Sequence, residues 1–116
     1  MSFQLEAVAA LIGARTDKWT DLGLACDTRP ISPNHGKPVV VADFRSAAWL
    51  VEILVWDTGE AEVGTIRVTD GRIVNKHYDL AGADDLERLL DELVLLLAND
   101  RIPASAVVAQ LPSASA

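Results

Sequence analysis

Residues 49–56 decide the fold, and they read Trp-Leu-Val-Glu-Ile-Leu-Val-Trp. Every second residue of this stretch is large and apolar, which is the period of a β-strand with one buried face. The opposite face carries three more apolar side chains and a single charge, Glu52. We therefore expect residues 48–56 to form a central strand, which helices cover on one side and which is half covered on the other.

Three further strands are predicted around this central strand. A β-branched run precedes it, and the Asp70-Gly71 pair after it is a signal for a two-residue hairpin. Because the connections are short, consecutive strands should pair antiparallel as a four-stranded meander. The strands are expected at 39–42, 48–56, 61–69 and 72–78, with short turns at 43–46, 57–60 and 70–71.

Two amphipathic helices flank the predicted sheet. Apolar residues spaced by two to four predict an N-terminal helix from about residue 3 to residue 25, which Gly13 can interrupt. A leucine-rich helix begins at Asp84, its predicted N-cap, with Glu87 as the capping-box partner, and ends at Asn99. Each helix has one apolar stripe to bury, so both should pack on one face of the sheet as a two-layer α+β fold.

The predicted core joins the apolar stripes of both helices to the inner face of the sheet. The prolines and glycine of residues 27–38 predict a loop, and residues 104–111 fit either a short helix or an edge strand. We expect one domain over residues 1–111 and a frayed tail at 112–116. The expected core residues are Leu5, Val8, Leu11, Val40, Val51, Ile53, Val55, Leu86, Leu90, Leu93 and Leu97.

The charge of this 116-residue chain is acidic and unevenly distributed. Seventeen acidic and ten basic residues give a net charge of −7, and all of the excess follows residue 46. This balance disfavours nonspecific binding to nucleic acid or to an anionic membrane surface. Since neither a basic signal-peptide region nor a membrane-spanning apolar run is present, the expected location is the cytoplasm.

Residues that carry chemistry are scattered along the chain. The single cysteine, Cys26, cannot form an intramolecular disulfide and is expected to be a buried, inert thiol at a helix end. His35 and His77 are far apart and have no nearby histidine or cysteine. Carboxylates such as Asp57 and Glu60 are typical of a solvated turn. We therefore predict no catalytic activity, no metal and no cofactor.

A partner surface is predicted where an aromatic residue meets carboxylates. All three tryptophans, Trp19, Trp49 and Trp56, are expected in the core, but Trp56 also ends the central strand beside an acidic turn. Aromatic anchors beside charges are common at protein interfaces. The predicted partner-binding residues are Trp56, Asp57, Glu60, Glu62, Asp70, Asp84 and Asp85.

Residues 48–97 also carry a family resemblance. The pattern consists of the turn Trp56-x-x-Gly59-Glu60, a hairpin at Gly71, a strand ending at His77-Tyr78 and the acidic start of the leucine-rich helix. It resembles the small actinobacterial immunity proteins of the TriTu family, which are encoded beside polymorphic toxins and neutralise them by binding. The resemblance implies a cognate toxin as partner. An acidic inhibitor suits a basic toxin, because opposite potentials raise the association rate.

Two other classes of function fit the composition. A small acidic secretion chaperone or adaptor that binds a secreted effector would need an exposed apolar groove or a dimer helix. A small enzyme or ligand-binding domain would need a pocket in which polar groups converge.

Overall fold

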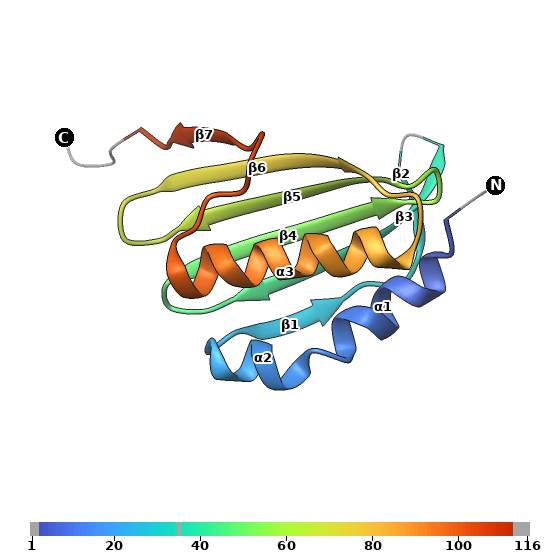
Figure 1. Ribbon diagram of the computed structural model, residues 1–116, viewed down its shortest axis with the longest axis horizontal. Coiled ribbons are helices and arrows are strands. Elements are labelled where there is room, and N and C mark those ends of the chain that lie inside the picture. Colours follow the sequence, from blue (N-terminus) through green and yellow to red (C-terminus); the bar gives the residue numbers. More distant parts are fainter. Residues whose placement is uncertain (1–2, 35, 113–116) are drawn as a thin grey trace.

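An antiparallel sheet with helices on one side forms the protein, as the computed structural model of residues 3–34 and 36–112 describes it (Figure 1). The strand order is β1-β3-β4-β5-β6-β7, and β2 pairs with β3 beside β1. The strands are β1 (Ala25–Thr28), β2 (Ser32–Asn34), β3 (Lys37–Arg45), β4 (Trp49–Trp56), β5 (Glu60–Arg67), β6 (Arg72–Asp79) and β7 (Val107–Gln110). The helices are α1 (Leu5–Gly13), α2 (Thr16–Asp21) and α3 (Ala83–Asn99).

The predicted α+β class and antiparallel sheet are confirmed, but the sheet has seven strands and not four. The long strand β3 accounts for two of the extra strands, because β2 pairs with its first residues and β1 with its last. The expected turn at 43–46 is therefore mostly strand, and the expected loop at 27–38 contains the end of β1 and all of β2. Pro33 and Pro38 lie opposite each other at this edge, where a missing amide donor costs little.

The other sheet edge settles the ambiguous segment at 104–111. Residues 107–110 form β7, which pairs antiparallel with β6 as an edge strand. All four of its residues are exposed, and Val107 is 67 % exposed. Because this strand packs against few side chains, no apolar alternation in its sequence distinguishes it from a short helix.

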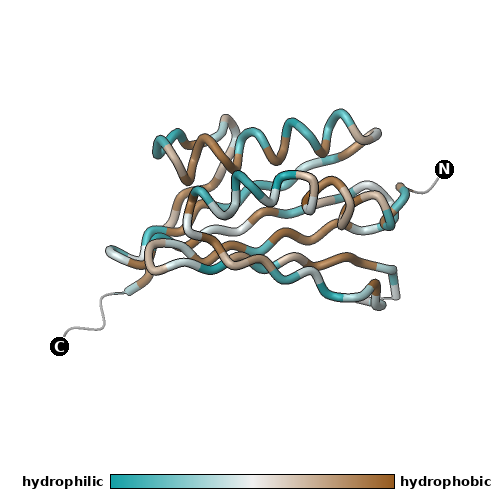
Figure 2. The backbone as a smooth tube through the Cα atoms, turned by 90° about the horizontal axis from the view of Figure 1, so that it is seen from below, coloured by the Kyte–Doolittle hydropathy of each residue, from teal (hydrophilic) through white to brown (hydrophobic). Residues whose placement is uncertain are grey.

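The core lies between the helices and one face of the sheet (Figure 2). In β4, alternate residues from Trp49 to Val55 are buried and face the helices, as the period-two pattern predicts. Six leucines of α3 are buried against this face: Leu86, Leu89, Leu90, Leu93, Leu96 and Leu97. All of the expected core residues are buried except Leu11, which is partly buried at the margin of the core.

Both helix predictions need correction at their ends. The N-terminal helix is divided into α1 and α2, and the chain has left the helix by residue 22. The N-cap of α3 is Gly82 and not Asp84, and no side chain caps it. Instead, Asp85 accepts a hydrogen bond of 2.8 Å from the backbone nitrogen of Ala81. A carboxylate in the first helical turn thus provides a hydrogen-bond acceptor for a backbone amide of the preceding loop.

The hairpin between β5 and β6 is held by a network of ion pairs. Asp70 accepts hydrogen bonds of 2.6 and 3.0 Å from the Arg67 guanidinium and one of 3.2 Å from the backbone nitrogen of Arg72. Arg67 and Arg72 also pair with Asp100, the C-cap of α3. The hydrogen bonds from Arg67 lower the pKa of Asp70 to about 2.

Replacement of Leu90 with Ala should lower the free energy of unfolding by about 2–5 kcal/mol, because it opens a cavity in a closely packed core. Leu90 has no exposed surface, whereas Leu95 on the same helix is 38 % exposed. Leu95→Ala is therefore the matched control and should change stability by less than about 1 kcal/mol. Chemical denaturation measures both values, and equal losses for the two variants would contradict this packing.

Replacement of Asp70 with Asn should destabilise the protein in a pH-dependent way. The folded-state pKa of Asp70 lies below its ordinary value of 3.8, so its contribution is complete above about pH 4. The contribution is lost as the pH falls towards 2. The difference in unfolding midpoint between the natural protein and Asp70→Asn should therefore shrink between pH 4 and pH 2. A difference of constant size from pH 7 to pH 2 would contradict the pairing.

Candidate partner-binding surface

The side of the sheet that faces away from the helices forms a continuous surface, which we call the open face. In the described residues, all three helices lie on the other side (Figure 2). Since Val40, Ala42 and Phe44 of β3 point into the core, the alternate residues of each strand point to the open face. Along β4 these are Leu50, Glu52, Leu54 and Trp56.

Three of the predicted partner residues share one end of the open face. Trp56 is half-buried, with Val39 of β3 directly opposite. Glu62 of β5 lies opposite Leu54, and Glu60 lies two residues before it. The side chains of Glu60 and Glu62 are 45 % and 58 % exposed. This end therefore combines an aromatic side chain with two accessible carboxylates, as the sequence predicted.

Both carboxylates have nearby cationic or titratable partners on the same face. The ammonium of Lys37 lies 3.4 Å from Glu60, and a ring nitrogen of His77 lies 3.7 Å from Glu62. These contacts join solvent-exposed side chains and are weak, because water and salt screen them. A stronger cationic partner can displace them at small cost.

The turn between β4 and β5 is built around Gly59. Its φ is +91°, and a β-carbon there would lie 2.4 Å from the backbone oxygen of Leu80. The backbone oxygen of Asp57 accepts a hydrogen bond of 2.6 Å from Phe3, and its nitrogen donates to Pro38. The turn is thus fixed to the N-terminal segment and to β3, and it holds Asp57, which is half-buried, at the rim of the Trp56 end.

The other three predicted residues lie elsewhere. Asp70 is in the β5–β6 hairpin, at the opposite end of the sheet, and pairs with Arg67 (Figure 1). Asp84 and Asp85 are in the first turn of α3, at the same end of the sheet as the β4–β5 turn but in the helix layer (Figure 1). The structure therefore divides the predicted acidic surface into three places, and only the Trp56 end lies on the open face.

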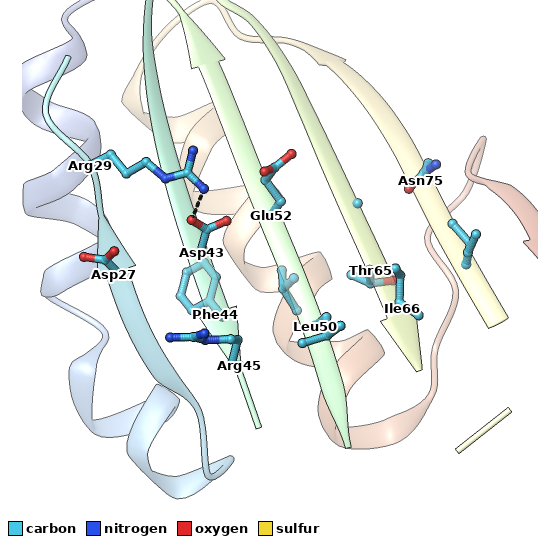
Figure 3. A pocket seen from close by; sticks show the side chains of 13 residues that line it. Asp27, Arg29, Asp43, Phe44, Arg45, Leu50, Glu52, Thr65, Ile66 and Asn75 are labelled. Carbon is cyan, nitrogen blue, oxygen red and sulfur yellow. Dashed lines mark hydrogen bonds and ion pairs between the residues drawn. The ribbon is translucent and has the colours of Figure 1, made fainter. Parts of the chain in front are cut away.

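The centre of the open face holds a hollow of about 720 Å³ that the sequence reasoning missed (Figure 3). Asp27, Asp43 and Glu52 lie side by side across β1, β3 and β4, and Arg29 bonds to Asp43. The sequence pattern predicts a loop at Asp27 and a turn at Asp43, whereas both residues lie in strands. The alternation of residues 40–45, which continues through Phe44 and Arg45, is a signal that could have found Asp43. No comparable local signal marks Asp27, which joins the row through the pairing of β1 with β3.

Neither Cys26 nor His77 belongs to a cluster of metal-ligating side chains in the described part of the chain. Cys26 is exposed on β1, and not buried at a helix end, because the chain after Gly23 is strand. Partial burial still raises the pKa of its thiol, which disfavours the reactive thiolate. His77 is exposed on β6, whereas His35 lies outside the described residues. Among residues 3–34 and 36–112, no group of three or more His, Cys, Asp or Glu side chains could hold a metal ion.

The described helices are also too short or too polar to span a membrane.

Comparison with known proteins identifies the family. The family model described as "Immunity protein TriTu" matches residues 6–96. The matched segment begins in α1, contains β1 to β6 and ends in the last turns of α3. No curated protein and no solved structure matches the chain significantly. Because the matched residues make up most of the chain, the protein belongs to the TriTu family of immunity proteins.

Proposed function

We propose that the protein neutralises a cognate toxin by binding it directly, without catalysis, and that the Trp56 end of the open face takes part in the contact. Membership of an immunity family supports a protective role. The observation that carries the binding mechanism is the open face itself, on which a half-buried tryptophan lies beside two accessible carboxylates. An inhibitor of this kind needs a rigid surface and no active site.

The physical properties of this surface suit an inhibitor. Side chains on a paired strand are held in place before binding, so little conformational freedom is lost on association. Large aromatic side chains contribute strongly to binding when water is excluded around them. A net charge of −7 attracts a basic partner over a distance and raises the association rate. We therefore propose a basic toxin, met in the cytoplasm.

The proposal rests on Trp56, Glu60 and Glu62, with Asp57 at the rim. Asp70 is already bound by Arg67, and Asp84 and Asp85 lie in the helix layer. The runner-up role, a secretion chaperone or adaptor, is less well supported because the family match concerns immunity proteins.

Reversal of Glu60 and Glu62 to Lys should slow association with the cognate toxin about tenfold or more and weaken the salt dependence of the rate. The toxin used is the inactivated product of the neighbouring toxin gene. The matched control reverses Glu6 and Asp21, which are exposed on α1 and α2, and changes the net charge equally. Stopped-flow kinetics from 50 to 300 mM salt measure both variants, with folding checked by circular dichroism.

The two pairs of reversals separate local steering from the effect of total charge. If both double variants slow association equally, only the net charge matters and the Trp56 end has no special role. If the natural protein does not bind the toxin at all, direct neutralisation is wrong.

A further inference from the structure

Three carboxylates lie in a row across the middle of the open face. Asp27, Asp43 and Glu52 are directly opposite one another on β1, β3 and β4. Neighbouring strands are about 4.8 Å apart, and like charges placed directly opposite repel. Asp43 is paired with Arg29, but within residues 3–34 and 36–112 neither Asp27 nor Glu52 has an ion pair. Asp27 and Glu52 are therefore exposed carboxylates without an ion pair in this part of the chain, and the hollow is also lined by Arg29 and by Arg45, which lies directly opposite Leu50.

An apolar row lies beside the carboxylates. Leu50 lies two residues before Glu52 on β4. Ile66 of β5 lies directly opposite Leu50, and Ile73 of β6 lies directly opposite Ile66. Leu50 is 42 % exposed, and the two isoleucines are half-buried. A single exposed leucine is common on protein surfaces, but three aligned apolar side chains form a continuous strip.

Gly64 continues the line of Asp27, Asp43 and Glu52 onto β5 and deepens the surface beside the apolar row. It lies opposite Glu52 on one side and Asn75 on the other. A β-carbon at Gly64 would lie 3.0 Å from the side-chain oxygen of Asn75, so the glycine leaves room that another residue would fill. The hollow of about 720 Å³ is lined by members of both rows, and Figure 3 shows their side chains standing over the strands.

We infer that this central hollow receives a segment of the toxin that presents a lysine or arginine side chain beside an apolar one. The cationic group would contact Glu52, which lies beside the apolar row, and the apolar side chain would cover Leu50 and Ile66. This inference rests on the proposed function and extends the contact from the Trp56 end to the middle of the sheet.

The combination of rows favours this occupant over the alternatives. A purely apolar segment would remove water from Glu52 without supplying a partner, which is costly. A purely basic segment would leave the apolar strip exposed to water. A second copy of this chain is the alternative that the sedimentation measurement below tests. Arg29 on Asp43 already shows that the row accepts a guanidinium.

The test measures the affinity of the inactivated product of the neighbouring toxin gene for four variants by calorimetry. Glu52→Lys should raise the dissociation constant about 30-fold or more, because an attractive charge pair in the interface is replaced by a repulsive one. Leu50→Ser should raise the dissociation constant about tenfold. The matched controls are Asp21→Lys on α2 and Leu95→Ser on α3, both exposed in the helix layer. They should change the dissociation constant less than threefold.

The outcomes distinguish this inference from the proposed function. If the natural protein binds the toxin and the two open-face variants bind as tightly as the controls, the inference is wrong and the proposed function stands. If the natural protein does not bind the toxin, the proposed function fails and the inference fails with it. Sedimentation of a dimer that Leu50→Ser disperses would assign the face to a second copy and also overturn the inference. Glu52→Lys lies on the exposed side of β4 and keeps the test decisive if Leu50→Ser does not fold.

Discussion

The packing of the α3 leucines on the inner face of β4 and its neighbours is the contact on which the rest of the structure depends. It buries Leu86, Leu89 and Leu90 completely and fixes which side of every strand points inward. Because side chains alternate along a strand, the same contact decides which residues point to the open face. A shift of one residue in β4 would bury Glu52 and expose Ile53, so the hydrophobic core also sets the composition of the candidate surface.

Polar contacts fasten the helix layer to the sheet and to itself. Arg15, between α1 and α2, donates hydrogen bonds of 2.7 and 2.8 Å to Asp91 and Glu87 of α3. Glu92 of α3 accepts hydrogen bonds from Lys76 and Tyr78 of β6, and burial raises the pKa of Tyr78, which keeps its hydroxyl protonated. Three acidic residues of α3 are thus already paired with other residues of the same chain. Fewer acidic side chains after residue 46 are therefore available to a partner than the charge of the sequence indicates.

The sequence predicted the parts of the fold whose signal is local. The alternation in β4, the hairpin around Asp70-Gly71 and the leucine spacing of α3 each depend on neighbouring residues and are confirmed. The hairpin connection, however, runs over four residues, 68–71, and not over the two that were expected. The prolines of residues 27–38 indicate a loop, so the end of β1 and all of β2 are not predicted. For residues 104–111 the sequence leaves an edge strand and a short helix open, and only the pairing of β7 with β6 decides between them. The candidate surface shows the same division. Glu60 and Glu62 follow Trp56 closely and lie beside it, whereas the row of Asp27, Asp43 and Glu52 depends on pairing between β1, β3 and β4.

We propose that the toxin contacts the open face and not the helix layer. Methyl-group NMR of the natural protein, titrated with inactivated toxin, tests this claim most directly because leucine and isoleucine methyls report on both sides of the molecule. The account predicts that the signals of Leu50, Ile66 and Ile73 shift or broaden while that of Leu95 on the exposed side of α3 stays unchanged. A shifted Leu95 signal with unchanged open-face signals would contradict it.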